Sequence, residues 1–197
     1  MKDYGILFSG GIDSTLLIHK YKESIAIAYY IDYGSNLNIK EKQIVINIAN
    51  KLNIPLKVID LGFLFRDSNS SIFTQEGLDS INNAIIPFRN TIMLSSVLPD
   101  CFFRGVKTLL IGTHYSDSSI FKDCTQSFNK AYNSMLNEAD NYKIEISAPL
   151  EGLTKNHIIQ EANTLKIDLS TTWSCYKGDK VPCGICSNCI IRRKYKI

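Results

Sequence analysis

The chain has 197 residues, of which 45% are hydrophobic and 21% are charged, with a formal net charge of +3. A single domain of this length can bury a hydrophobic core without disulfide bonds. No apolar run is long enough to span a membrane, no signal segment opens the sequence, and the small net charge gives no general attraction to nucleic acid or membranes. We therefore expect a cytoplasmic protein that does not act at a membrane.

A glycine-rich loop follows the first apolar run of the chain. Residues 4–8 are predicted to form a short buried strand, and residues 14–21 have the spacing of a helix. Gly10 and Gly11 lie between them, so that the backbone can approach a ligand at a helix N-terminus, where unpaired N–H groups attract phosphate. We expect the nucleotide-binding residues to be Phe8, Ser9, Gly10, Gly11, Ile12, Asp13, Ser14, Thr15, Leu16, Leu17 and Ile18.

Asp13 identifies the expected ligand more closely. A carboxylate beside bare phosphate is unfavourable unless a divalent cation bridges them, and Mg²⁺ commonly binds through one carboxylate and substrate phosphates. The loop lacks the lysine that ends a Walker motif. Mg²⁺ with ATP is therefore the expected occupant, and an ordinary glycine-rich turn is the alternative.

Strands and helices alternate along most of the remaining chain. We expect strands at residues 25–31, 56–60, 107–112 and 143–147, and helices at 39–52, 91–104, 125–138 and after Thr154. This pattern predicts an α/β fold with a mostly parallel sheet, whose ligands collect at the carboxyl ends of the strands. Asn90 is the expected N-cap of the third helix, and residues 63–86 show no periodicity and are expected to form a long loop or flap.

Several polar residues fall at the predicted ligand edge of the sheet. His114, Asp117 and Asp123 follow the fourth strand, and Arg89 opens a helix that leads back to the sheet. Lys155 stands in the first turn of the last helix, where it opposes the helix dipole unless an anion is nearby. We expect Arg89, Asp117, Asp123 and Lys155 to line an acceptor pocket, although loop residues of this kind are equally often merely solvated.

Four of the six cysteines crowd into the last quarter of the chain. Cys175, Cys183, Cys186 and Cys189 have the spacing of a tetrahedral Cys₄ shell, which favours a structural Zn²⁺ over an iron–sulfur cluster or four separate buried thiols. Such a closed shell has no position for substrate. The expected organisation is therefore an α/β domain at residues 1–170 with a C-terminal zinc-binding segment at 171–197 packed on it.

Three blocks together resemble one enzyme family over nearly the whole chain. They are the loop at residues 8–15, the sequence Thr172-Trp173-Ser174-Cys175-Tyr176, and the tail that runs from Cys183 to Arg192. The loop is similar to that of the ATP pyrophosphatases, and all three blocks resemble the 7-cyano-7-deazaguanine synthase (QueC) family. The resemblance implies an adenine-nucleotide α-hydrolase-like fold and a reaction of 7-carboxy-7-deazaguanine with ATP and ammonia that gives the nitrile. The resemblance also implies that the loop binds ATP and that the four cysteines bind zinc.

The resemblance is weaker on the acceptor side. This chain has Ser35, Asn36 and Leu37 where the family has Gln-Arg-His, Phe88 where it has glycine, and Thr125 where it has arginine. Two alternatives therefore stay open beside the synthase: a ligase that joins the same carboxylate to a protein amine, and a zinc-knuckle nucleic-acid-binding module. Asp13, Lys155 and Arg89 are the predicted catalytic residues, Arg89, Asp117 and Asp123 the predicted acceptor-binding residues, and a homodimer is left open.

Overall fold

The computed structural model describes residues 2–35, 38–74, 76–77, 79–139, 142–177 and 181–197. The strands are β1 (Tyr4–Leu7), β2 (Ile25–Asp32), β3 (Leu56–Asp60), β4 (Thr108–Leu110) and β5 (Glu145–Ser147). The helices are α1 (Ile12–Lys20), α2 (Asn38–Lys51), α3 (Gly62–Phe65), α4 (Ser71–Thr74), η1 (Ile81–Ala84), α5 (Arg89–Phe103), α6 (Tyr115–Ser118), η2 (Lys122–Cys124), α7 (Gln126–Ala139), α8 (Lys155–Thr164), η3 (Leu169–Thr171) and α9 (Ser187–Lys194). Within the described ranges, no helix has the length and apolar composition needed to cross a bilayer.

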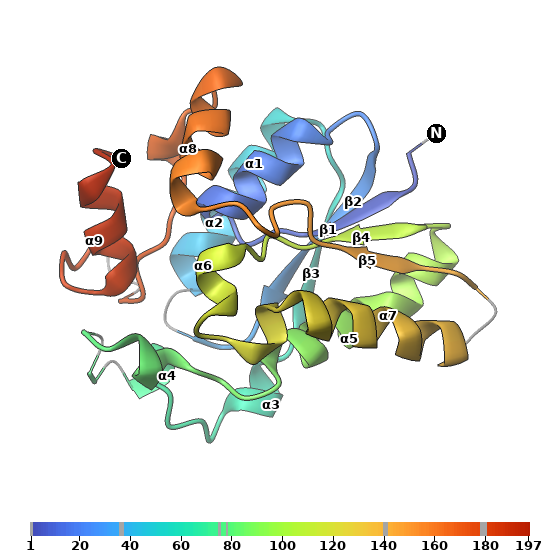
Figure 1. Ribbon diagram of the computed structural model, residues 1–197, viewed down its shortest axis with the longest axis horizontal. Helices are drawn as coiled ribbons and strands as arrows, with labels where there is room; N and C mark the ends of the chain where they lie inside the picture. Colours follow the sequence, from blue (N-terminus) through green and yellow to red (C-terminus); the bar gives the residue numbers. More distant parts are fainter. Residues whose placement is uncertain (1, 36–37, 75, 78, 140–141, 178–180) are drawn as a thin grey trace.

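The five strands form one parallel sheet in the order β3-β2-β1-β4-β5. Strand β2 shows why both faces must be covered, because its buried residues alternate between two cores. Ala28 and Tyr30 pack into the core formed with α1, α2 and α8, whereas Tyr29 and Ile31 pack into the core formed with α5 and α7. Figure 1 shows α1 and α8 on one side of the sheet and α5 and α7 on the other. The predicted parallel α/β fold is confirmed.

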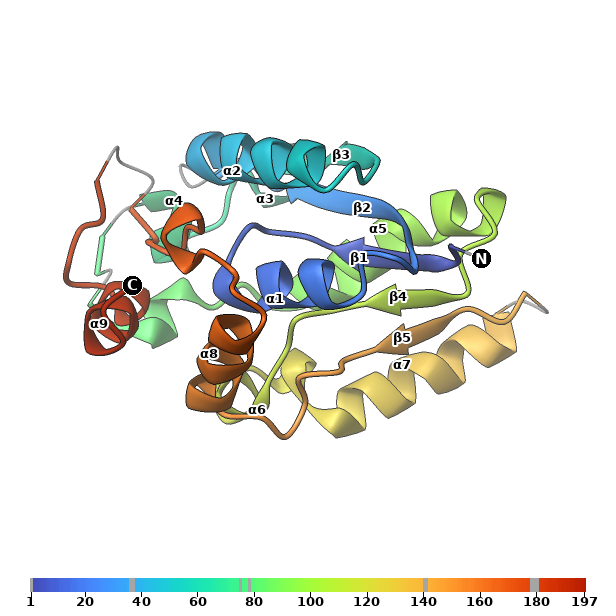
Figure 2. The ribbon, with the colours of Figure 1, turned by 90° about the horizontal axis from the view of Figure 1, so that it is seen from above.

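The carboxyl ends of the strands all point toward one edge of the molecule. Figure 2 shows α6 and α9 on this side, beyond the arrowheads of the strands. The loop between β1 and α1 and the segments after β2, β4 and β5 reach the same edge. One edge of the sheet therefore receives nearly all the residues that the sequence predicts to be functional.

The prediction of a long loop or flap at residues 63–86 is wrong where the segment forms short helices that pack into the core. Its described part contains the short helices α3, α4 and η1, and Phe65, Ile72 and Ala84 are buried in the core on the α5 and α7 side. Helices of four residues are too short to show periodicity in a sequence, because one turn brings only one or two side chains to the core.

The predicted start of α5 is also wrong. The helix begins at Arg89, and the preceding Phe88 has the left-handed conformation with φ of 60°. Asn90 does not cap the helix, since its backbone N–H donates to Asp123 Oδ2 at 3.0 Å and its side-chain Nδ2 donates to the Asp123 carbonyl at 3.0 Å. The predicted cap of α8 is confirmed, because Thr154 Oγ1 accepts from the His157 backbone N–H.

Candidate active site

The loop between β1 and α1 leaves a helix N-terminus open. Gly10 has a φ of 73°, and a Cβ added there would lie 3.0 Å from Ile44 Cγ2, so the tight turn requires glycine. Gly11 occupies the N-cap position without a side-chain hydrogen bond to the first turn. The N–H groups of that turn are therefore available to an anion, and the hydroxyls of Ser9 and Ser14, 3.2 Å apart, flank them.

Asp13 and Lys155 form an ion pair beside this helix N-terminus. Lys155 Nζ donates to Asp13 Oδ1 at 2.6 Å and to Oδ2 at 2.7 Å, and both side chains are largely enclosed. This contact explains a lysine in the first turn of α8, since the nearby carboxylate offsets its unfavourable interaction with the helix dipole. A divalent cation at Asp13 would have to share that carboxylate with Lys155.

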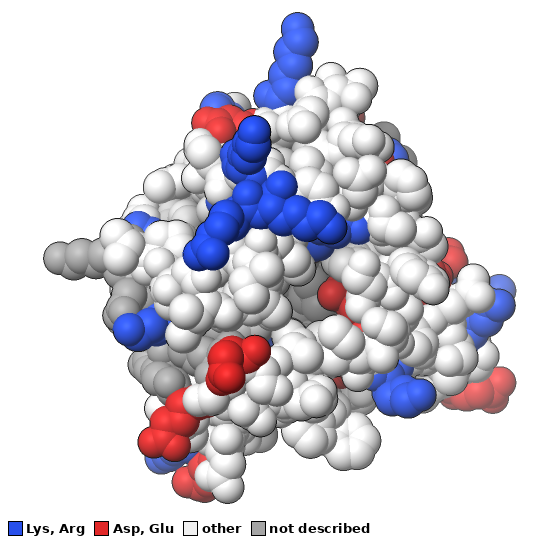
Figure 3. Space-filling view, turned by 60° about the vertical axis from the view of Figure 1, so that its left-hand side comes forward, with Lys and Arg blue, Asp and Glu red and all other residues white. Residues whose placement is uncertain are grey.

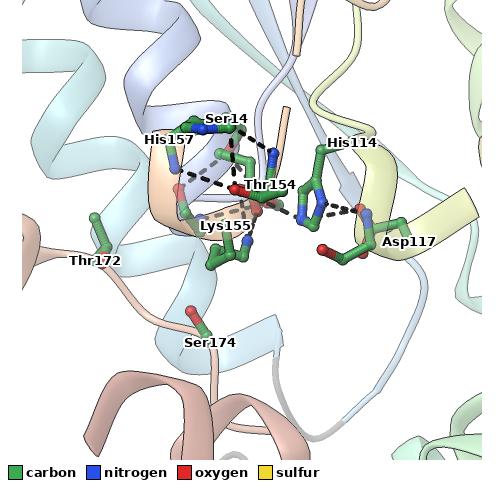
Figure 4. Close-up of polar contacts among 12 residues, drawn as sticks. Ser14, His114, Asp117, Thr154, Lys155, His157, Thr172 and Ser174 are labelled. Carbon is green, nitrogen blue, oxygen red and sulfur yellow. Dashed lines mark hydrogen bonds and ion pairs between the residues drawn. The ribbon is translucent and has the colours of Figure 1, made fainter. Parts of the chain in front are cut away.

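His114 connects this ion pair to Asp117. Its Nδ1 accepts from the Ser116 backbone N–H at 3.2 Å, which fixes the proton of the neutral ring on Nε2. That Nε2 lies 3.3 Å from Asp117 Oδ2 and 3.7 Å from Asp13 Oδ1 (Figure 4). Burial lowers the pKa of His114 and raises the pKa of Asp117, so both environments favour the neutral forms.

The loop and the strand ends enclose a cavity of about 450 Å³. Figure 3 shows a hollow on this side of the molecule, with basic and acidic side chains around it. We call the residues Ser9, Gly11, Asp13, Ser14 and Lys155 the loop side of the cavity. The Arg89 side of the cavity comprises Tyr33, Glu41, Arg89 and Tyr176.

The other predicted site residues fall in several places. Asp117 lines the cavity with His114. Asp123 lies outside the set of lining residues, and its carboxylate holds the Asn90 backbone. Of the remaining loop residues, Phe8 and Ile12 line the cavity, and the following are buried in or beneath the loop: Gly10, Thr15, Leu16, Leu17 and Ile18.

Aromatic groups surround the guanidinium on the Arg89 side. The Arg89 Cζ atom lies 6.0 Å from the centre of the Phe121 ring. Burial acts against its charge, but the nearby Tyr33, Tyr176 and Asp123 outweigh that effect and raise its pKa. A cation enclosed in this way suits a carboxylate or phosphate ligand.

Glu41 is a cavity residue that the sequence did not reveal. It stands in the first turn of α2, where an acidic residue normally serves only the helix dipole. Here it lines the cavity, and burial raises its pKa to about 7, with Arg89 and Tyr30 opposing that rise. Only its position relative to the end of β2 distinguishes it from a solvated helical glutamate, and that position follows from the fold.

The C-terminal segment forms another wall of the cavity and is bonded to the loop. The backbone N–H of Trp173 donates to the Gly10 carbonyl at 3.1 Å. Arg192, on α9, lines the cavity while donating to Thr172 Oγ1 at 2.9 Å and to the Leu169 carbonyl at 3.2 Å. The segment that carries the cysteines therefore also helps to shape the site.

The four cysteines lie together as a metal shell requires. The Sγ atoms of Cys175, Cys183, Cys186 and Cys189 are all within 4.8 Å of one another, and those of Cys183 and Cys189 are 3.9 Å apart. A tetrahedral zinc site with Zn–S bonds of about 2.3 Å places its sulfurs about 3.8 Å apart. Backbone N–H groups also donate to Cys175 and Cys183 sulfurs, which stabilises thiolates. The donor set fits a structural metal.

The positions that depart from the family pattern can be located only in part. Ser35 is buried near the end of β2, whereas Asn36 and Leu37 lie outside the described residues. The Thr125 hydroxyl accepts from the Phe128 N–H at 3.2 Å and donates to the Lys122 carbonyl at 2.8 Å, so this residue caps α7.

Comparison with known proteins identifies relatives of the whole chain. The family described as "Queuosine biosynthesis protein QueC" matches residues 5–195. A 7-cyano-7-deazaguanine synthase of Porphyromonas gingivalis (strain ATCC BAA-308 / W83) is 32% identical over 201 residues, covering 98% of this chain and 91% of that protein. One from Campylobacter fetus subsp. fetus (strain 82-40) is 33% identical over 200 residues, covering 95% and 89%.

A solved structure of similar fold is that of NMN synthetase from Francisella tularensis. It superposes with a TM-score of 0.55 at 14% sequence identity, over 92% of this chain and 69% of that one. At this identity the likeness concerns the α/β fold alone. The match over residues 5–195 and the relatives at 32% and 33% identity show that the chain belongs to the QueC family of queuosine biosynthesis proteins.

Proposed function

We propose that this protein is an ATP-dependent 7-cyano-7-deazaguanine synthase. The observation that carries the proposal is that the open N-terminus of α1 and the Arg89 guanidinium line one cavity. One group suits the phosphates of ATP, and the other suits the carboxylate of 7-carboxy-7-deazaguanine, so an acid and its activating nucleotide can be held together. The 7-cyano-7-deazaguanine synthases that align with nearly the whole chain support the same activity.

The loop side would bind the nucleotide phosphates. The first-turn N–H groups of α1 and the hydroxyls of Ser9 and Ser14 offer donors to the leaving pyrophosphate. Lys155 would move part of its interaction from Asp13 to phosphate oxygens, and Asp13 would then hold Mg²⁺ if the metal accompanies ATP. Mg²⁺ supplies charge neutralisation of the phosphates when bound.

The reaction then follows from the groups that the cavity brings together. A carboxylate oxygen attacks the α-phosphorus, the bond to the bridging oxygen breaks, and pyrophosphate leaves. Ammonia attacks the acyl carbon and AMP leaves, which gives the amide. The amide oxygen then attacks the α-phosphorus of a second ATP and a second pyrophosphate leaves. Loss of AMP and two protons from this adenylated amide gives the nitrile. Arg89 would hold the carboxylate and then the acyl phosphate, while His114 keeps its proton on Nε2 toward Asp117.

The zinc ion expected at the four cysteines would have a structural role. Cys175, Cys183, Cys186 and Cys189 would hold the metal in a closed shell, without a position for substrate. Its effect on the site would come through Trp173, whose backbone N–H donates to the Gly10 carbonyl, and through Arg192, which donates to Thr172 and Leu169.

One observation favours a second function, an amide-forming ligase that uses a protein amine. Thr125 caps α7 at a position where the family pattern has arginine, so no guanidinium is available there for ammonia handling or the second activation. A ligase of this kind would consume one ATP per product instead of two.

Mass spectrometry of the product, with pyrophosphate counted, decides between these functions. The protein is incubated with 7-carboxy-7-deazaguanine, ATP and ammonium. We expect the nitrile at two pyrophosphates per product. The amide at one pyrophosphate, or no product until a protein amine is supplied, would replace the synthase with the ligase. Release of ADP in place of AMP would contradict both.

A further inference from the structure

The carboxyl group of Glu41 faces the cavity from the first turn of α2. It lines the same cavity as Tyr30 and Tyr33 at the end of β2 and as Arg89 at the start of α5. Two parts of the fold that are far apart in sequence thus place a carboxyl group and a guanidinium on one wall.

Glu41 differs from the other acidic residues of the cavity in its partners. Asp13 is paired with Lys155, and Asp117 lies 3.3 Å from His114 Nε2. Glu41 takes part in no ion pair among the described residues, and its side chain is hydrogen-bonded to Tyr30. Its electrostatic neighbours are Arg89, Asp32 and the phenols of Tyr30 and Tyr33. The hydrogen bond from Tyr30 and the charge of Arg89 offset only part of the unfavourable burial of this carboxylate. Its place in the lining of a binding cavity therefore points to further donors that arrive with a ligand.

We propose that Glu41 binds the N–H edge of the acceptor's heterocycle, where a ring N–H and a neighbouring exocyclic NH₂ both act as donors. This inference rests on the proposed function. Two carboxylate oxygens can accept from two adjacent donors at once, which gives a short bidentate contact. Arg89 on the same side then serves the acid group of the same molecule, so Glu41 selects the ring and Arg89 selects its carboxylate.

The chemistry of ATP makes adenine a poorer match for Glu41. On adenine the exocyclic NH₂ stands beside ring nitrogens that are acceptors. An ionised carboxylate has only acceptors, so one of its oxygens would face a lone pair. A 2-aminopyrimidinone edge, as in 7-carboxy-7-deazaguanine, presents two donors instead.

The test compares two acids that differ only in the exocyclic amine. Calorimetry measures Kd for 7-carboxy-7-deazaguanine and for its analogue without the 2-amino group. The proteins are the wild type, Glu41→Gln, and Glu23→Gln as a control at an exposed glutamate. The wild type and the control should prefer the amino compound by about tenfold or more, because the contact is a hydrogen bond to a charged group. Glu41→Gln should bind both acids with similar affinity.

Glu41→Asp is a second variant that keeps the charge but shortens the reach. It should also lose most of the discrimination, and both variants should bind α,β-methylene-ATP as the wild type does. If both variants bind both acids more weakly by the same factor, Glu41 has a structural role and the inference is overturned. If only the binding of the ATP analogue is weakened, Glu41 contacts adenine, and the inference is likewise overturned.

The experiment separates this inference from the proposed function. A wild-type protein that binds neither acid would refute the proposed function. A wild-type protein that binds both acids equally well, and forms product from both, would leave the function standing and refute only the role of Glu41.

Discussion

On the loop side of the cavity the charges of Asp13 and Lys155 neutralise each other at 2.6 Å, whereas on the Arg89 side the carboxyl of Glu41 forms no ion pair with any residue that the structure describes. The loop side also takes its anion-binding groups from backbone, whose position is fixed by Gly10 and α1. The Arg89 side is built from side chains of α2, α5 and the C-terminal segment. In the proposed function, the loop side is therefore preassembled for phosphate, while the Arg89 side is completed by its ligand.

The largest effect is expected from the segment on which both sides depend. Cys186→Ser removes one of four metal ligands, and a structural zinc site contributes an apparent 10–16 kcal/mol, roughly, to folding. We expect metal-free and largely insoluble protein, measured by elemental analysis and yield. The control is Cys101→Ala, since Cys101 is a buried residue of α5 that does not belong to the cluster. A soluble Cys186→Ser protein that retains its metal would show that the cysteines are not a closed shell.

Asp13→Asn tests the loop side directly. The substitution keeps the shape of the side chain but removes the charge that Lys155 and a bound cation would share. We expect pyrophosphate release to fall by about a hundredfold or more, because the charge acts on developing phosphate charge, with little change in Tm. Turnover at the wild-type rate would remove Asp13 from the chemistry, and a large fall in Tm would make the ion pair structural.

Arg192→Gln tests how firmly the C-terminal segment supports the cavity. The variant loses the hydrogen bonds of the guanidinium to Thr172 and Leu169. A hydrogen bond from a charged donor contributes roughly 1.5–3 kcal/mol to stability. We expect the free energy of unfolding to drop by about 2 kcal/mol, measured by urea denaturation. Arg193→Gln, which loses an exposed bond to the Gly184 carbonyl, should change it by less than about 1 kcal/mol. Equal effects would contradict a bracing role for Arg192.

The pH dependence of stability tests whether the carboxyl of Glu41 is enclosed, in contrast to the ion-paired Asp13. Its pKa is about 7 in the folded protein, above the ordinary value of 4.5, so the folded state binds more protons between these values. Stability gained from the protonated carboxyl is therefore complete below about pH 4.5 and is lost as pH rises through 7. Relative to Glu41→Gln, the wild type should lose on the order of 1–2 kcal/mol between pH 5 and 7.5 in urea titrations. Parallel pH profiles of the two proteins would contradict the enclosed carboxyl.

The smallest effect is expected at Phe88, which precedes Arg89. Its left-handed φ of 60° is unfavourable for a side chain that is 74% exposed and gains little from packing. Phe88→Gly should raise the free energy of unfolding by about 1 kcal/mol. Phe88→Ala keeps the backbone strain and serves as the control, so an equal gain in that variant would assign the effect to the exposed ring.

The sequence predicted the parts of the molecule that depend on neighbours along the chain. The alternation of apolar runs gave the parallel sheet, the Gly10-Gly11 turn gave the loop, and the spacing from Cys175 to Cys189 gave the cluster. Each of these features depends on residues that are close together in the sequence, so that a local pattern predicts it. The capping of α8 by Thr154 belongs to the same class, since the cap and its partner are three residues apart.

The contacts that the sequence could not predict join distant segments. Lys155 meets Asp13 across 142 positions, and Glu41 reaches the cavity only because β2 and α5 meet there. Asp123 was predicted to face the acceptor, but in the structure its carboxylate holds the start of α5. A carboxylate has the same appearance in a sequence whether it caps a helix, pairs with lysine or faces a ligand.

The hydrogen bond from Trp173 to the Gly10 carbonyl also bears on how the protein is made. The loop between β1 and α1 is translated before the residues that brace it and close the cavity, from Trp173 to Arg192. Domains fold as units while the chain emerges, so this site can form only when the cysteine segment has left the ribosome and folded. In the proposed function, a nascent chain would then be unable to consume ATP before the cysteine segment has been translated.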